Sequence, residues 1–182
     1  LGTSSTLINN IAQWANVNAF LLLQKSFGGS GYDIACAQND TPIRYQLIGN
    51  NPIVKNVNFQ PEFAEQLFFV HLNQKQDSKE GIKKYKRVPK GNINYIEQIS
   101  DLTNQIILCD SLPKFEVLIK KHESIISNII QEKTIQEKFF SDYFGQTKSL
   151  GAWGGDFILA TGNSATPNYF KNRGFKTVIP FK

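Results

Sequence analysis

The sequence predicts an α+β fold, with short strands and amphipathic helices divided between two lobes. Residues 43–48 alternate apolar and polar side chains, as a half-buried strand does. Residues 94–108 and 114–131 repeat apolar side chains at the spacing of a helix. The stretch Phe-Gln-Pro at residues 59–61 interrupts these patterns, and we expect the boundary between the two lobes there.

The first lobe is expected to contain two helices followed by a pair of strands. The apolar residues after a Ser/Thr-rich start lie on one helical face: Leu7, Ile8, Ile11, Trp14 and Ala15. A second helix is predicted over Ala19–Ser26, and the glycines that follow it end the helical pattern. The alternating strand Ile43–Ile48 comes next, and a turn with a weaker strand is expected at residues 50–58.

The second lobe is expected to alternate strands with helices. Its predicted strands are residues 68–72, 157–161 and 176–180. Its predicted helices are residues 94–108, 114–131 and 135–144, with a short one near residues 167–174. A glycine-rich loop is expected over residues 148–162, where it leads into the second of these strands.

The composition narrows the classes of function. The 182 residues are 41% hydrophobic, which is enough to bury one good core or two small ones. Only 19% of the residues are charged, so the chain is not of the disordered type. The net charge of +5 favours an anionic partner, which nucleic acid and phosphorylated metabolites both satisfy.

The spacing of the cysteines and histidines and the shortness of the apolar runs indicate a cytoplasmic protein without a membrane partner. Cys36 and Cys109 lie far apart and form no metal-ligand pair, so we expect two reduced thiols. His71 and His122 are also too separated to suggest a zinc site. No apolar run is long enough to span a bilayer, and no signal peptide is seen.

Three short motifs carry candidate chemistry. The first is the small, polar stretch at residues 1–6, which runs into the first predicted helix. Free backbone N–H groups at a helix start favour an anion, and hydroxyls can bind phosphate or Mg²⁺. No Gly-Lys-Ser/Thr closes the stretch, so it is not a Walker loop. Taken alone, it is better explained as a capped helix start.

The second motif is the run Gly-Gly-Ser-Gly-Tyr-Asp at residues 28–33. Its glycines permit close backbone approach, and an acid directly after such a turn can face a ligand. Taken alone, an aspartate that stabilises the turn is the better explanation. The third motif is the glycine-rich run at residues 148–157. It is either a tight entry into a strand or a lid over a bound nucleotide or substrate.

In their order and content, these motifs together resemble those of the GHMP kinases, the group of galactokinase, homoserine kinase, mevalonate kinase and phosphomevalonate kinase. Residues 1–6 look like the end of the Pro-x-x-x-Gly-Leu-Gly-Ser-Ser phosphate loop. Ser30-Gly31-Tyr32-Asp33 is similar to the Ser-Gly-x-Asp segment with the catalytic aspartate, and residues 148–156 to the third, glycine-rich motif. Residues 71–79 resemble the strand and Ser-Thr-Lys loop that open the C-terminal half.

The wording Gly-Ser-Gly-Tyr-Asp-Ile-Ala is closest to phosphomevalonate kinase and to bacterial relatives named for their Gly-Tyr-Asp-Ile-Ala stretch. The resemblance implies that residues 1–58 are the last part of an N-terminal lobe like ribosomal protein S5 domain 2. It implies a ferredoxin-like C-terminal lobe for residues 59–182. Met is absent and the chain opens on a loop. We therefore expect the first lobe's opening strands upstream of Leu1, and no activity without them.

The resemblance also implies an ATP- and Mg²⁺-dependent kinase that phosphorylates a hydroxyl or phosphate of a small anionic metabolite, such as a phosphomevalonate-like compound. Asp33 is the implied catalytic residue. The implied nucleotide-binding residues are Gly2, Thr3, Ser4, Ser5 and Thr6, with Ser4 or Ser5 at the metal. The implied substrate-binding residues are Ser30, Gly31, Ser78, Lys79, Gly151, Gly154 and Gly155. The oligomeric state is open, and a homodimer is one option.

The chain departs from the family pattern at two places. Trp153 and Asp156 stand within a run that is usually all glycine. Leu22, Leu23 and Gln24 stand where mevalonate kinases carry a Mg²⁺-binding glutamate, which argues against mevalonate kinase itself. These departures keep a second interpretation open, a non-catalytic relative that binds a nucleotide or metabolite. A third interpretation is RNA binding, from the positive charge and the kinship with ribosomal proteins, but no RNA motif supports it.

Overall fold

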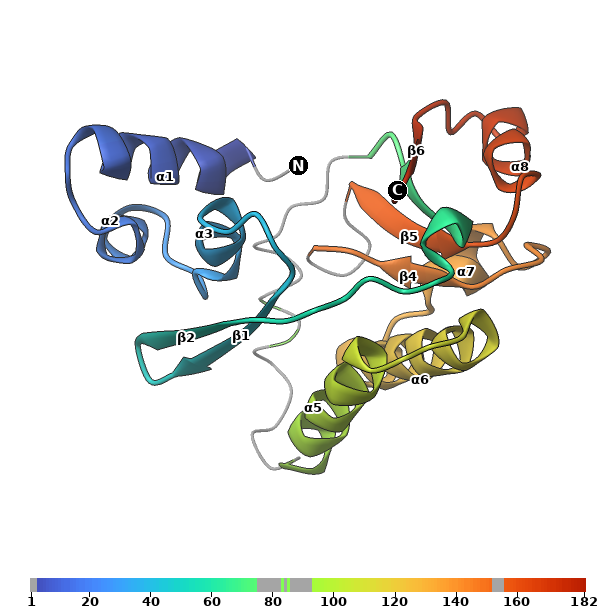
Figure 1. Cartoon of the computed structure of the whole chain (residues 1–182), viewed down its shortest axis with the longest axis horizontal. Coiled ribbons are helices and arrows are strands. Elements are labelled where there is room, and N and C mark those ends of the chain that lie inside the picture. The colour runs from blue at the N-terminus through green and yellow to red at the C-terminus, as the bar shows by residue number, and fades with distance from the viewer. Residues whose placement is uncertain (1–2, 75–82, 84, 86–92, 152–155) are drawn as a thin grey trace. The chain divides into compact units, whose positions relative to one another are not determined.

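The computed structural model describes residues 3–74, 83, 85, 93–151 and 156–182 (Figure 1). The chain separates into two compact units, Leu1–Phe59 and Gln60–Lys182. The division falls within the stretch of residues 59–61 where the sequence patterns break. The assignment of the two units to the two lobes of a GHMP kinase stays a prediction.

Three helices form the core of the first unit: α1 (Thr3–Trp14), α2 (Ala19–Ser26) and α3 (Tyr32–Ala37), seen in Figure 1. Asn18 caps α2 by accepting a hydrogen bond from Leu21 N at 3.0 Å. The buried residues that join the helices are Ile8, Ala12, Ala19, Leu23 and Ile34. The two predicted helices are confirmed. The sequence did not predict α3, because six residues are too few to show a helical period.

A β-hairpin completes the first unit. The strands β1 (Ile43–Ile48) and β2 (Asn51–Asn56) pair antiparallel, from Ile43 opposite Asn56 to Ile48 opposite Asn51. Gly49 occupies the turn with φ of 59°, a left-handed conformation that favours glycine. Both predicted strands are confirmed.

The second unit is built on a four-stranded antiparallel sheet in the order β4-β5-β3-β6. Its strands are β3 (Leu67–His71), β4 (Thr147–Ser149), β5 (Phe157–Thr161) and β6 (Val178–Pro180). A short 3₁₀ turn, η1 (Ala64–Gln66), precedes β3. The three predicted strands are confirmed within two residues. The sequence did not predict β4, because its three residues, Thr-Lys-Ser, carry no apolar alternation.

The helices of the second unit are α5 (Ile93–Ile107), α6 (Leu112–Ile130), α7 (Ile135–Phe139) and α8 (Thr166–Asn172). The predictions for α5, α6 and α8 are confirmed. The helix predicted over residues 135–144 is too long. It ends at Phe139, and Phe140 and Tyr143 leave the helix to enter the core. No helix within the described ranges is long and apolar enough to cross a bilayer.

The core of the second unit holds one end of β5 to α8. Val70, Ile158 and Ala160 of the sheet pack against Ile135, Phe140 and Phe170. The Tyr143 hydroxyl donates to the Thr161 carbonyl oxygen at 2.6 Å and lies 2.9 Å from Thr166 Oγ1. A Cβ atom on Gly162 would lie 2.0 Å from Thr166 Oγ1, so only glycine fits there.

Candidate functional site

The first candidate feature is the start of α1. Ser4 and Thr6 are exposed and Ser5 is half-buried, so their hydroxyls border the helix start. The first turn of this 12-residue helix contains no acidic residue. Its backbone N–H groups and the helix dipole therefore meet no carboxylate on that turn, and the turn can receive an anion. Gly2 and the side chain of Thr3 lie outside the described part of the chain.

The second feature is the turn that leads into α3. Gly31 is the N-cap of α3 and has φ of 80°. It is buried, and an added Cβ atom would lie 2.8 Å from Phe20 Cδ1 and 3.3 Å from the Tyr45 hydroxyl oxygen. The Tyr45 hydroxyl also donates to the Ser30 carbonyl oxygen. The turn is thus fixed between α2 and β1, and its geometry requires glycine.

Asp33 is exposed in the first turn of α3, where the helix dipole favours a carboxylate. Burial raises the pKa of its neighbour Tyr32 to about 12, with Cys36 and then Asp33 adding to the shift. Burial also raises the pKa of the Cys36 thiol. A hydrogen bond from Tyr32 lowers this pKa in part, and the charge of Asp33 raises it further. Tyr32 and Cys36 therefore stay protonated at neutral pH beside the carboxylate of Asp33.

The first two motifs lie on helices that pack against each other. Ile8 of α1 and Ile34 of α3 belong to the same core cluster. Gln38 Nε2 donates to the buried Asn9 Oδ1 at 3.0 Å, which joins the end of α3 to the middle of α1. The structure thus brings Asp33 and the serines of the α1 start into one unit.

The third motif belongs to the second unit. Gly151 follows β4, is exposed and has φ of 67°. Leu150 N donates to the Phe157 carbonyl oxygen at 3.1 Å, and Leu72 N donates to the Asp156 carbonyl oxygen at 2.8 Å. The other predicted substrate-binding residues of this unit, Ser78, Lys79, Gly154 and Gly155, lie outside the described residues, as does Trp153.

The α2 positions at which the sequence resemblance implied a metal-binding acid hold other side chains here. Leu23 is 8% exposed and belongs to the core, and Gln24 is exposed. Among the residues that the structure describes, no three His, Cys, Asp or Glu side chains gather into a metal site.

A buried polar cluster on α6 and β4 was not predicted from the sequence. The Glu123 side chain is 7% exposed. It accepts from Ser149 Oγ at 2.8 Å and lies 3.5 Å from Lys148 Nζ. His122 Nδ1 is 3.9 Å from Glu123 Oε1, a distance too long for a hydrogen bond.

Burial dominates the electrostatics of this cluster. It lowers the pKa of Lys148, although Glu123 opposes the shift. Burial, helped by the charge of Lys148, lowers the pKa of His122 to about 4. Glutamate on an amphipathic helix is usually exposed. The signal that could have revealed the burial of Glu123 is its spacing from Ile119 and Ile126, four and three residues away on the apolar face.

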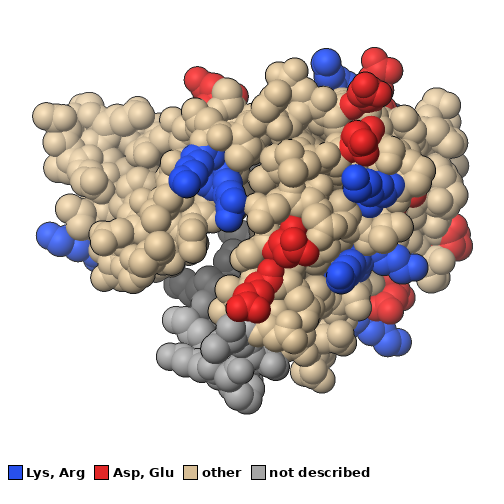
Figure 2. Space-filling model, turned by 60° about the horizontal axis from the view of Figure 1, so that its bottom comes forward, with Lys and Arg blue, Asp and Glu red and all other residues tan. Residues whose placement is uncertain are grey.

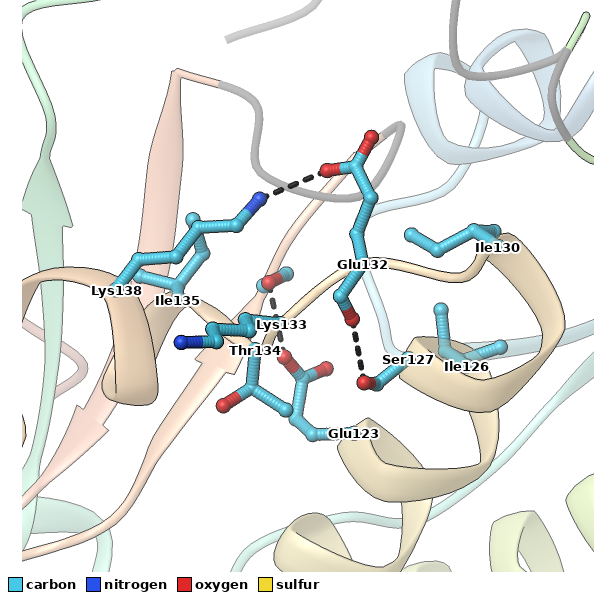
Figure 3. A pocket seen from close by; sticks show the side chains of 10 residues that line it. Glu123, Ile126, Ser127, Ile130, Glu132, Lys133, Thr134, Ile135 and Lys138 are labelled. Carbon is cyan, nitrogen blue, oxygen red and sulfur yellow. Dashed lines mark hydrogen bonds and ion pairs between the residues drawn. The ribbon is translucent and has the colours of Figure 1, made fainter.

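Figure 3 shows a small pocket beside Glu123, between α6 and α7. Its space of about 20 Å³ is enough for one water molecule. Two charged side chains on its rim pair with each other, Lys138 Nζ with Glu132 Oε2 at 2.7 Å. Ser127 Oγ donates to the Glu132 carbonyl oxygen at 2.5 Å. The pocket is too small for a metabolite.

Charges are interspersed on the face shown in Figure 2, where Lys and Arg side chains neighbour Asp and Glu. The described Lys and Arg side chains of that face therefore do not form one broad patch.

Comparisons with known proteins give the fold. No family model matches the sequence, and no curated protein matches it. Among solved structures, L. major mevalonate kinase in complex with R-mevalonate superposes with a TM-score of 0.63 over 88% of this chain, at 16% identity. The chain shares the fold of that kinase. It spans about half of the kinase's length, 54%. The predicted mixture of helices and strands is thereby confirmed.

Proposed function

We propose that this chain carries the phosphate-binding helix and the catalytic aspartate of an ATP-dependent small-molecule kinase of the GHMP type. The observation that carries the proposal is the fold likeness to a mevalonate kinase over 88% of the chain. The three sequence motifs point to the same family independently of that likeness. In the second unit, α5, α6 and α7 lie between β3 and β4 in the chain, and α8 lies between β5 and β6. With the three helices taken as one crossover, the order is β-α-β-β-α-β, which supports a ferredoxin-like lobe.

The start of α1 is the proposed nucleotide site. Phosphoryl transfer depends mainly on positioning and charge neutralisation. The first-turn amides of α1 and the hydroxyls of Ser4, Ser5 and Thr6 would donate to the phosphates of ATP, with Gly2 and Thr3 completing the loop. Ser4 or Ser5 would lend a hydroxyl to Mg²⁺. This ion usually keeps several waters and binds through substrate phosphates, so a dedicated carboxylate cage is not required.

Asp33 is the proposed catalytic residue, which accepts or orients the proton of the acceptor hydroxyl. Its exposure and its place after the rigid Gly31 turn suit that role. Ser30 and Gly31 would face the acceptor, and Ser78 and Lys79 would bind its anionic group. Gly151, Gly154 and Gly155 would contact the acceptor as well. A small anionic metabolite as partner, rather than nucleic acid or a membrane, and a cytoplasmic location are part of the same proposal.

Replacing Asp33 by Asn tests the catalytic role in the full-length protein. We expect kcat to fall by about 100-fold or more, because a general base contributes that much. Asp40→Asn is the matched control, since Asp40 is also exposed and lies outside the motif. Both variants should fold like the wild type. An Asp33→Asn variant that phosphorylates its acceptor near the wild-type rate would show that Asp33 is not the base.

A binding protein without turnover is the second candidate function. The buried Leu23 at the position of a metal-binding acid favours it. Trp153 and Asp156 in the third motif favour it as well. Tight ATP binding without transfer to any acceptor would distinguish this function from a kinase.

A further inference from the structure

The strand β4 lies just before Gly151, which the proposed function places at the acceptor. It lies at the edge of the sheet, next to β5, and its three residues pair from Thr147 opposite Ala160 to Ser149 opposite Ile158. Gly151, the first predicted substrate-binding residue of the third motif, comes two residues after its end. A short edge strand has one ladder neighbour, so side-chain contacts have a large share in fixing it.

One carboxylate from α6 holds two consecutive residues of β4. Ser149 Oγ donates to Glu123 Oε2 at 2.8 Å, and Lys148 Nζ lies 3.5 Å from Glu123 Oε1. The side chain of Glu123 is 7% exposed and that of Lys148 is 22% exposed. Water competes little for these contacts, and each is stronger than it would be on the surface.

The beginning of β4 is held separately, by α7. Gln136 Oε1 accepts from Thr147 N at 2.9 Å, and Gln136 Nε2 donates to the Gly145 carbonyl oxygen at 3.0 Å. Glu123 therefore acts on the other end of the strand, where the chain continues into Leu150. There, Leu150 N donates to the Phe157 carbonyl oxygen and extends the ladder by one bond.

We propose that Glu123 is a positioning residue for acceptor binding. By holding Lys148 and Ser149, it fixes the position of the backbone at Gly151. This inference rests on the proposed function. Stability alone does not account for the charged pair, because a buried ion pair is often no more stabilising than apolar residues of similar volume. The neighbours of Glu123 on this helix face, Ile119 and Ile126, show that apolar residues suit the site.

The test compares Glu123→Gln and Ser149→Ala with Tyr143→Phe in the full-length protein. Tyr143→Phe is the matched control, because it removes a buried hydroxyl that bonds to the opposite end of β5, at Thr161. We measure the hydrogen-exchange rate of the Leu150 amide and, separately, KM for the acceptor and kcat. We expect Glu123→Gln and Ser149→Ala to speed the exchange by about tenfold or more. They should raise the acceptor KM by about tenfold, since misplaced binding groups cost that much or more.

The control should lose stability without either change. Unchanged Leu150 exchange in a folded Glu123→Gln variant overturns the inference, and so does faster exchange with an unchanged acceptor KM. If Glu123→Gln does not fold, Ser149→Ala decides by the same two readouts. If the wild type transfers no phosphoryl group, the proposed function fails. The Leu150 exchange rate then still supports or overturns the anchoring of β4 by Glu123.

Discussion

Gly31→Ala is the substitution whose cost can be worked out most directly from the structure. Gly31 has φ of 80°, and a residue with a Cβ atom in this left-handed region costs about 1–2 kcal/mol. The new Cβ atom would also lie 2.8 Å from Phe20 Cδ1 and 3.1 Å from Phe20 Cε1. Forcing the Phe20 ring aside adds about 1–3 kcal/mol, the usual cost of overpacking. The free energy of unfolding should therefore fall by roughly 2–5 kcal/mol.

Gly28→Ala is the matched control for this prediction. Gly28 has φ of 69° but nothing within 4 Å of an added Cβ atom, so its variant should lose only the backbone cost of about 1–2 kcal/mol. Urea unfolding followed by circular dichroism measures both variants. Equal losses for Gly31→Ala and Gly28→Ala would refute the close packing of this turn against α2.

Two further predictions concern the second unit. The pKa of His122 is about 4 in the folded chain and about 6.5 when unfolded, so the unfolded chain alone takes up this proton between those pH values. Relative to His122→Gln, the wild type should lose about 3 kcal/mol of unfolding free energy as pH falls from 7 to 4. Parallel pH profiles would contradict this. Thr134 and Glu137 form a capping box at the start of α7. Thr134→Ala should lower the unfolding free energy by about 1 kcal/mol, and Thr134→Ser by less, in the same urea assay. Equal losses would mean that the cap hydroxyl is not responsible.

Long, periodic segments were predictable from the sequence. Helix α6 could be read because its apolar residues repeat over 19 residues, and β3 because it is a continuous apolar run. The short elements α3 and β4 were not predictable, because their sequences are too short to show the repeat of a helix or a strand. Contacts with other parts of the fold hold them in place. Helix α7 was predicted too long, because the aromatic residues after Phe139 continue an apolar pattern that instead fills the core.

Part of the local geometry around the candidate site was predictable from short motifs. The glycines before Asp33 predicted a turn, and the structure has one there, with Gly31 as the N-cap of α3 and Asp33 exposed two residues later. The roles of these residues in binding and catalysis stay predictions. Glu123 was missed because its role depends on Lys148 and Ser149, which lie more than 20 residues further along the chain. A sequence pattern cannot pair residues across such a distance without the fold.

Transfer of the terminal phosphoryl group of labelled ATP tests the central claim most directly. The full-length protein is incubated with γ-labelled ATP, Mg²⁺ and a panel of small hydroxylated or phosphorylated acids, and the label is followed into product. The account predicts label in one anionic acceptor, with transfer lost in Asp33→Asn and kept in Asp40→Asn. Saturable ATP binding with no label in any acceptor would contradict it and indicate a nucleotide-binding protein without kinase activity.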